Sequence, residues 1–369
     1  MSRRLGILGG GQLGRMLALA AYPLGVTCRF LDPKDPTSSG EVGELMAESY
    51  DDPDALDRFV TGLDAVTYEF ENVEAGAAEH LEQRTELRPG RRALEVAQDR
   101  LVEKTFFRDQ GLDTASFASV DTRKELDAAV GEIGLPAVLK TRRFGYDGKG
   151  QALLRAAGDV DGAWEQLGGV PLILEGFVDF QRELSIVAVR GSDGEIRPYP
   201  LAENVHEDGI LRVSYAPAPD VPEALLDRAH DYARRVLEAL DYVGVVAIEL
   251  FQDGGRLLAN EMAPRVHNSG HWTIEGAETS QFENHVRAVL GLPLGSTAMR
   301  GHAAMVNFIG ALPEAAEVLE VPDAHLHFYG KEPRPGRKVG HVTVRHEDPV
   351  RVRETVERLR QLDGARHDG

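Results

Sequence analysis

The chain has 369 residues, a length that predicts about two or three domains rather than one core. Its formal charge of −19 argues against broad nucleic-acid binding, because phosphate backbones are held by dense lysine and arginine. No apolar run approaches the roughly 18 residues that span a bilayer, and glycines interrupt the first apolar stretch, so we expect neither a membrane span nor a signal peptide. The single cysteine, Cys28, fits a reducing, cytoplasmic location.

The first segment alternates between strand-like and helix-like patterns. Apolar runs predict strands at residues 5–8, 26–31 and 65–70, and residues 12–21 form a plausible helix between the first two. Strands that alternate with helices predict a parallel, doubly wound sheet. Pro89-Gly90 is the expected end of this unit.

The rest of the chain predicts a long helix, a mixed region, a hairpin and a final small unit. The expected helices are residues 93–110, a helix near 160–167, and 224–240. The expected strands are residues 135–140, 172–175, 184–189, 243–251, 257–262, 303–309 and 339–345. Gly254-Gly255 joins the fourth and fifth of these strands as a hairpin turn.

A glycine turn (residues 9–14) follows the first strand. Its sequence, Gly-Gly-Gly-Gln-Leu-Gly, matches G-x-G-x-x-G, and Asp32 lies at about the distance of a ribose-binding acid. Such a turn presents backbone amides and a helix N-terminus to a phosphate. By itself the pattern indicates a nicotinamide-dependent oxidoreductase, although close helix–strand packing alone would also explain it. We predict phosphate contact of some kind.

A glycine loop (residues 140–151) is the strongest signal for chemistry. It combines two lysines with three glycines within twelve residues, namely Lys140, Lys149, Gly145, Gly148 and Gly150. Flexible backbone amides and two lysines can surround the β- and γ-phosphates of a nucleotide and neutralise their charge. The loop is not a P-loop, because no helix with Lys-Ser/Thr follows it. We predict a triphosphate site here rather than a solvated charge run.

The hairpin places a carboxylate in an apolar strand. Glu249 is flanked by Val, Ala, Ile, Leu and Phe, and a buried strand does not accept an unpaired carboxylate without cost. A two-residue turn would set it opposite Asn260, and a three-residue turn would set it opposite Glu261. Either register gathers hard oxygen ligands that suit Mg²⁺. The alternative is a salt-bridged core glutamate, with Arg265 as its partner.

Two further stretches carry candidate ligand contacts. Residues 175–178 close a strand, and their carboxylate and main-chain groups could read an adenine edge, although an ordinary strand end is equally consistent. An anion loop (residues 265–272, Arg-Val-His-Asn-Ser-Gly-His-Trp) could hold a small planar anion through the fork of Arg265. Its two histidines lack a third nitrogen or sulfur ligand nearby, so we discount zinc. Phosphate capture is a separate prediction for the basic residues Lys331, Arg334, Arg337 and Lys338.

Taken together, these motifs resemble the 5-(carboxyamino)imidazole ribonucleotide synthases, the ATP-grasp carboxylases of purine biosynthesis. The resembling stretches follow in matching order, at residues 9–16, 68–72, 140–151, 204–210, 260–272 and 331–341. The resemblance implies an α/β and α+β chain with an ATP-grasp fold. It implies a Rossmann-like domain (1–97), an ATP-grasp domain (98–295) with a mobile lid (about 118–178), and a small C-terminal domain (296–369).

The resemblance also implies the ligands and the residues that bind them. The substrates would be ATP with Mg²⁺, bicarbonate and 5-aminoimidazole ribonucleotide, and the enzyme would be a homodimer. ATP would contact Arg100, Lys140, Gly145, Tyr146, Asp147, Gly148, Lys149, Gly150, Gln151, Glu175, Gly176, Phe177, Val178, Glu183, His206, Asn260 and Glu261. Magnesium would be held by Glu249 and Glu261. The catalytic residues would be Arg265, His267, Asn268, Ser269 and Lys331. The ribonucleotide would contact Gln12, Leu13, Glu71, Tyr146, Lys331, Arg337 and Lys338.

The implied mechanism needs no nucleophilic serine or cysteine, because a bicarbonate oxygen attacks the γ-phosphate. Positioning and charge neutralisation would carry the reaction. Carboxyphosphate would hydrolyse in water, so the lid is expected to close first. The carboxyl group would reach the amine directly or as CO₂. Phe144 departs from the family pattern, which commonly has glycine there, and we expect it to stiffen the lid.

Functions of other classes explain less of the chain. A nicotinamide oxidoreductase would leave the glycine loop, the hairpin carboxylates and the basic C-terminal loop without roles. A non-catalytic binding protein would not need two metal carboxylates beside a phosphate loop. Among ATP-grasp enzymes the competitors are formate-using transformylases, biotin carboxylases and peptide-type ligases, and the anion loop best distinguishes this chain from them.

Overall fold

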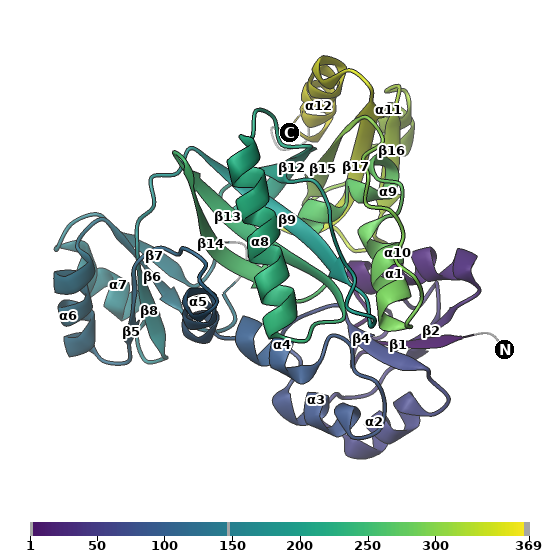
Figure 1. Ribbon diagram of the computed structural model, residues 1–369, viewed down its shortest axis with the longest axis horizontal. Coiled ribbons are helices and arrows are strands. Elements are labelled where there is room, and N and C mark those ends of the chain that lie inside the picture. The colour runs from purple at the N-terminus through teal and green to yellow at the C-terminus, as the bar shows by residue number, and fades with distance from the viewer. Residues whose placement is uncertain (1–2, 146–147, 365–369) are drawn as a thin grey trace.

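The computed structural model describes residues 3–145 and 148–364, and these form three sheets around the centre of the molecule. Figure 1 shows the N-terminal unit below and to the right, and the large central sheet in the middle. A small unit built on the third sheet projects to the left. The three sheets therefore meet around a shared middle, where the site described below lies.

The N-terminal sheet is parallel, as the sequence predicted. Its strand order is β3-β2-β1-β4, with β1 in the middle. The strands are β1 (Arg4–Leu8), β2 (Thr27–Leu31), β3 (Glu44–Met46) and β4 (Ala65–Tyr68). The accompanying helices are α1 (Gln12–Ala21), η1 (Tyr22–Leu24), α2 (Pro53–Val60) and α3 (Ala75–Glu82). Because the strands are parallel, the carboxyl ends of β1 and β4 meet at one edge, beside the start of α1.

The single helix predicted over residues 93–110 is wrong, since the segment forms two helices. They are α4 (Arg91–Ala97) and α5 (Arg100–Asp109). The Asp99 carboxylate accepts hydrogen bonds from the backbone N–H groups of Leu101 and Val102, so it caps the start of α5. This break places Arg100 and the buried Lys104 on a helix that begins at the site.

The projecting unit has its own sheet and its own core. Its strands β5 (Phe117–Val120), β6 (Ala137–Thr141), β7 (Gln151–Leu154) and β8 (Leu172–Gly176) are antiparallel in the order β5-β8-β6-β7. Helices α6 (Arg123–Ile133) and α7 (Asp159–Leu167) pack on it. Because Lys140 pairs with Gln151, the glycine loop is the connection of the β6–β7 hairpin. The unit matches the segment that the resemblance assigns to a lid.

The central sheet is antiparallel and has the order β14-β13-β9-β11-β12-β15-β17-β16, with β10 beside β9. Its strands are β9 (Arg182–Arg190), β10 (Ile196–Pro198), β11 (Ala202–Glu207), β12 (Ile210–Ala216), β13 (Gly244–Asp253), β14 (Arg256–Ala263), β15 (His302–Ile309), β16 (Ala324–Phe328) and β17 (Lys338–His346). Helix α8 (Glu223–Ala239) covers one face (Figure 1). The remaining helices are η2 (Asn268–Gly270), α9 (Thr273–Gly276), α10 (Gln281–Val289), α11 (Ala315–Leu319) and α12 (Pro349–Gly364). Since β12 pairs with β15, the final unit continues the central sheet.

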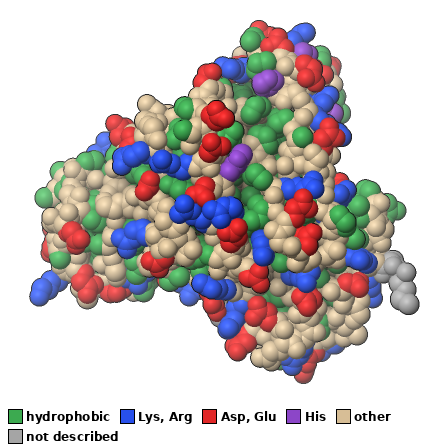
Figure 2. All heavy atoms as spheres, viewed as in Figure 1, with side chains coloured by type: hydrophobic (Ala, Val, Ile, Leu, Met, Phe, Trp, Pro, Cys, Tyr) green, Lys and Arg blue, Asp and Glu red, His purple; other side chains and the backbone are tan. Residues whose placement is uncertain are grey.

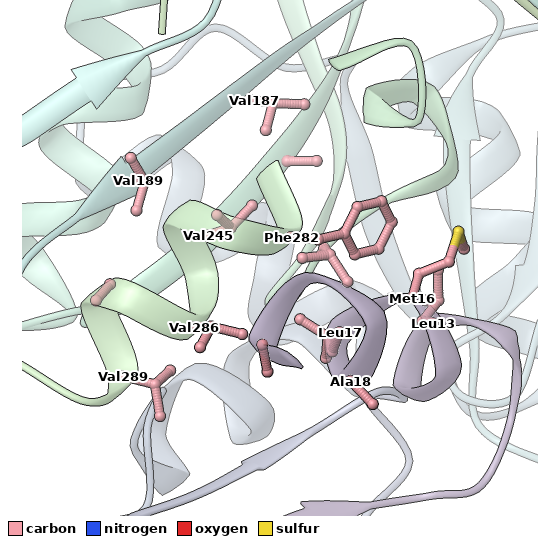
Figure 3. Packing of buried hydrophobic residues seen from close by; sticks show 14 of the residues in the cluster. Leu13, Met16, Leu17, Ala18, Val187, Val189, Val245, Phe282, Val286 and Val289 are labelled. Carbon is pink, nitrogen blue, oxygen red and sulfur yellow. The ribbon is translucent and has the colours of Figure 1, made fainter. Parts of the chain in front are cut away.

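One apolar cluster fixes the N-terminal unit against the central sheet. Leu13, Met16 and Leu17 of α1 pack against Phe282 and Val286 of α10, as Figure 3 shows. Valines of β9 and β13 lie on the other side of α10 in the same cluster. Burial of side chains of this size contributes about 1.5–3 kcal/mol each. The packing holds the first turn of α1 at the edge of the site.

Candidate active site

A cavity of about 620 Å³ lies where the three sheets meet. Figure 2 shows acidic, basic and histidine side chains mixed over the middle of the face that Figure 1 presents. Most of the residues proposed from the sequence line this cavity: Gln12, Leu13, Glu71, Arg100, Lys140, Gly145, Gly148, Lys149, Gln151, Glu175, Gly176, Phe177, Val178, Glu183, His206, Glu249, Asn260, Glu261, Arg265, His267, Asn268 and Lys338. Residues as far apart in the sequence as Gln12 and Lys338 therefore share one cavity.

Several proposed residues do not line the cavity. Gly150, Lys331 and Arg337 lie outside its lining, and Tyr146 and Asp147 lie outside the described residues. Ser269 is fully buried, and its Oγ lies 2.9 Å from Nδ1 of His267. The side chain of Ser269 is thus hydrogen-bonded to His267, and its direct contact with bicarbonate stays a prediction.

The hairpin resolves the open question of register through a β-bulge. The turn has two residues, Gly254 and Gly255, since Asp253 pairs with Arg256. A regular ladder would then pair Glu249 with Asn260, but the register shifts between Glu249 and Leu250 and pairs Glu249 with Glu261. Asn260 is the extra residue, and its buried Oδ1 has no partner among the described residues. The two carboxylates and this amide oxygen therefore gather on one hairpin.

The two hairpin carboxylates differ in their surroundings. Burial and the neighbouring Glu261 raise the pKa of Glu249 above its usual range. Burial also acts to raise the pKa of Glu261, but Arg100, whose Nη1 lies 2.8 Å from its Oε2, outweighs this and lowers it. Nε2 of His267 lies 3.4 Å from Oε1 of Glu249. Two carboxylates at paired positions of one hairpin favour a bound cation, which would relieve their repulsion.

Glu175, at the end of β8, is held by two lysines. Its Oε2 lies 3.0 Å from Nζ of Lys140 and 3.3 Å from Nζ of Lys104. Burial acts to raise the pKa of Glu175, but Lys104 and then Lys140 outweigh it and lower the pKa to about 2. The other oxygen, Oε1, is buried without a hydrogen-bond partner in the described part of the chain. It is a ready acceptor for a donor group in the cavity.

The glycine turn holds carboxylates of the protein itself. Gly10 N–H donates to Oδ2 of Asp32 at 2.8 Å, and Gly14 N–H donates to Oε2 of Glu69 at 2.7 Å. Gly11 N–H donates to Oε1 of the same Glu69. A Cβ at Gly11 would lie 2.5 Å from this oxygen. The amides of Gly10, Gly11 and Gly14 are thus already used, which corrects the expectation that they contact a phosphate.

Hydrogen bonds between side chains hold the anion loop in place. Nε of Arg265 lies 2.6 Å from Oε2 of Glu71. Asn268 and Asn307 exchange amide hydrogen bonds of 3.0 and 2.7 Å. Burial and Arg265 lower the pKa of His267 to about 3, so its imidazole is neutral near pH 7. These contacts fix the orientations of the Arg265, His267 and Asn268 side chains, as binding of a small anion requires.

The glycine loop itself carries an unusual backbone. Gly148 and Gly150 have φ values of 74° and 72°, which glycine adopts easily. Phe144 also has a positive φ of 63°, although its side chain is 70% exposed and packs little. A left-handed conformation costs a residue with a Cβ roughly 1–2 kcal/mol. The glycine that the family pattern commonly has at position 144 would adopt this conformation without strain.

The basic C-terminal loop lies near the start of α1. Burial lowers the pKa of Lys331 to about 8, and Arg337 and Lys338 act in the same direction, whereas Glu69 opposes them. Nη1 of Arg337 donates to the carbonyl of Glu332 at 3.1 Å. Lys338, unlike the other two basic residues, lines the cavity. The loop thus brings positive charge to the cavity through Lys338 and to Glu69 through Lys331.

Sequence reasoning missed three charged residues beside this site: the buried Glu103 and Lys104, and the half-buried Glu69. Burial and Glu261 raise the pKa of Glu103 to about 8, and its Oε1 accepts from Met262 N–H at 2.7 Å. Lys104 follows Arg100 by one helical turn, and this spacing is a signal that could have placed both on one face of α5. Glu69 offered a weaker signal, as a carboxylate directly after a buried strand.

Comparison with known proteins agrees with this geometry. Models of three families match in order: the ribonucleotide synthetase preATP-grasp domain at residues 1–98, the ATP-grasp domain at 105–282, and the phosphoribosylaminoimidazole carboxylase C-terminal domain at 303–355. An N5-carboxyaminoimidazole ribonucleotide synthase of Pseudomonas aeruginosa is 53% identical over 359 residues, covering 97% of this chain and 99% of that protein. This chain belongs to the N5-carboxyaminoimidazole ribonucleotide synthase family.

Solved structures of this family superpose closely. A synthetase from Thermus thermophilus has a TM-score of 0.94 and 60% identity, covering 97% of this chain and 98% of its own. The synthase of Aspergillus clavatus, solved with ADP and 5-aminoimidazole ribonucleotide, has a TM-score of 0.92 and 32% identity, covering 99% of each chain. The fold and the ATP-grasp ligase activity predicted from the sequence are confirmed. The described helices include none long and apolar enough to cross a membrane.

Proposed function

We propose that this protein uses ATP to carboxylate 5-aminoimidazole ribonucleotide with bicarbonate, giving the N5-carboxy product, ADP and phosphate. The observation that carries the proposal is the convergence of three motifs on one cavity. These are the glycine loop with Lys140, the Glu249–Glu261 pair, and the anion loop beginning at Arg265. A nicotinamide oxidoreductase finds no support, because the glycine turn on which it would rest is filled by Glu69.

ATP is proposed to lie between the projecting unit and the central sheet. Lys140 and the loop glycines would contact its phosphates, and Oε1 of Glu175 would accept a hydrogen bond from the adenine amino group. Arg100 and Lys149 would add positive charge near the phosphates. Phe180 and Phe251 stack with their rings 4.6 Å apart at the apolar side of the cavity, which suits a flat base.

Magnesium is the metal that we propose for the hairpin. Glu249, Glu261 and the unpartnered Oδ1 of Asn260 offer the hard oxygen ligands that Mg²⁺ prefers. When bound, the ion would neutralise charge on the transferred phosphoryl group. The raised pKa of Glu249 agrees with this role, since that carboxylate is disfavoured as an anion without a cation beside it.

The acceptor chemistry is assigned to the anion loop. Arg265, held in place by Glu71, would bind bicarbonate. A bicarbonate oxygen would then attack the γ-phosphorus of ATP, and ADP would leave. His267 and Asn268 would orient the resulting carboxyphosphate, with Ser269 holding the ring of His267. The substrate amine then takes the carboxyl group, directly or as CO₂, and phosphate is released. Closing the projecting unit would exclude water from this intermediate.

The ribonucleotide is proposed to bind beside α1 and the basic C-terminal loop. Gln12, Leu13 and Lys338 line the cavity, and Lys331 and Arg337 would add positive charge for the phosphate of the ribonucleotide. Tyr146, which lies outside the described residues, remains a proposed contact by the family motif. We propose a cytoplasmic homodimer as the working form, as the family resemblance implies.

Two measurements test this function. Phosphate release from ATP is expected to depend on Mg²⁺ and on aminoimidazole ribonucleotide, and equal turnover with formate, biotin or an amino acid would overturn the assignment. Glu261→Gln is expected to lower turnover at least about a hundredfold while the fold is kept. Turnover within about threefold of the wild type would remove Glu261 from the metal site.

A further inference from the structure

Lys104 is a buried cation without a role in the chemistry proposed above. It lies on α5 with 1% of its surface exposed and does not line the cavity. Its Nζ lies 3.3 Å from Oε2 of Glu175 and 3.4 Å from the carbonyl of Ala259. Lysine is almost never fully buried unless it is paired. Its contacts therefore indicate that Lys104 acts by holding the Glu175 carboxylate.

The two oxygens of Glu175 have different environments. Oε2 receives both Lys104 and Lys140, whereas Oε1 is buried and has no hydrogen-bond partner in the described ranges. Glu175 is 3% exposed and lines the cavity. A buried acceptor without a partner destabilises the protein, so this oxygen is suited to meet a donor that enters the cavity.

The two lysines differ in what else they can touch. Lys140 lines the cavity, and the proposed function assigns it to the phosphates of the nucleotide. Lys104 is shielded from the cavity, so Glu175 remains its charged partner whether or not Lys140 turns toward a phosphate. Of the two, Lys104 is the one that can hold the Glu175 carboxylate permanently.

We infer that Lys104 is a positioning residue for base selection, which holds the Glu175 carboxylate so that its free oxygen accepts the 6-amino group of adenine and repels a 6-carbonyl. This inference rests on the proposed function and deepens it, since it predicts that ATP is preferred over ITP. A site built to accept one hydrogen bond strongly rejects a ligand that presents another acceptor there. The low pKa of Glu175 agrees with this role, because a protonated carboxyl group would donate to a carbonyl.

The test is Lys104→Met, which keeps the length of the side chain and removes its charge. We expect the ratio of kcat/KM for ATP over ITP to fall at least about tenfold, mainly through KM for ATP. Lys104→Arg should restore most of the ratio. Lys124→Met, at an exposed lysine of α6, is the matched control and should leave the ratio unchanged. A ratio within about twofold of the wild type in Lys104→Met would overturn the inference, even if both rates fall.

A second measurement keeps the inference falsifiable if Lys104→Met does not fold. Glu175→Gln keeps Lys104 and can present an amide N–H₂ to a carbonyl, so the relative affinities for ADP and IDP, measured by calorimetry, should become similar. An unchanged preference for ADP would overturn the inference. The proposed function would fail differently, as an absence of ribonucleotide-dependent phosphate release from ATP by the wild type.

Discussion

The molecule contains two glycine-rich segments that look alike in sequence and differ in what fills them. In the glycine turn, the amides of Gly11 and Gly14 donate to Glu69 and the amide of Gly10 donates to Asp32. In the glycine loop, Gly145 and Gly148 line the cavity instead. Glycine spacing thus reports that something approaches the backbone closely, but it does not tell whether a ligand or the protein itself does so.

The same physics operates at both places. The start of a helix and a run of free amides attract an anion, and in the glycine turn that anion is a carboxylate from the end of β4. Glu69 thereby links β4 to α1 and leaves Gln12 and Leu13 to face the cavity. The turn is part of the scaffold, whereas Gly145 and Gly148 of the glycine loop line the cavity.

The largest difference in stability is expected between variants in which a glycine of the glycine turn or of the glycine loop is replaced by alanine. Gly11→Ala should destabilise the protein by about 3 kcal/mol, because its Cβ would lie 2.5 Å from Oε1 of Glu69 and would break a charged hydrogen bond. Gly148→Ala, with its nearest neighbour at 3.4 Å, should cost only about 1 kcal/mol for its positive φ while lowering turnover more than stability predicts. Urea unfolding measures the two changes in stability, and phosphate release from ATP measures turnover.

The control for these variants is Gly76→Ala in α3, where a Cβ would meet nothing within 4 Å. It should raise the free energy of unfolding by up to about 1 kcal/mol. Equal losses of stability for Gly11→Ala and Gly148→Ala would show that the two segments are not as different as their contacts imply.

The second prediction concerns Glu69, the carboxylate that accepts hydrogen bonds from the glycine turn. Burial raises the pKa of Glu69 above its ordinary value of 4.5, so its contribution to stability is complete below that pH and falls as the pH rises through the raised pKa. Glu69→Gln removes this titration. From pH 4.5 to pH 8 the free energy of unfolding should shift in favour of the variant. Parallel stability curves for variant and wild type would contradict this.

The smallest effect is expected at Phe144 in the glycine loop. Asparagine tolerates the left-handed conformation better than phenylalanine, and the exposed ring makes few contacts to lose. Phe144→Asn should therefore raise the free energy of unfolding by about 0.5–1 kcal/mol, as measured by thermal unfolding. A destabilised variant would mean that the ring packs in a way that its exposure does not reveal.

The sequence by itself determined the local elements and the chemistry of the motifs. Residues 12–21 form the predicted helix without any shift in bounds, and the N-terminal strands pair in parallel as expected. These features were predictable because apolar periodicity and turn residues act over a few neighbours. The resemblance then brought together residues that no local pattern connects.

Only the tertiary structure decided which distant groups meet. The bulge at Asn260 set Glu249 opposite Glu261 despite a two-residue turn, and Glu69 filled the glycine turn from another strand. Lys104 reached Glu175 from a helix 71 positions earlier in the chain. Such choices depend on long-range packing and on the need to pair every buried charge, and neither is written in the spacing of neighbouring residues.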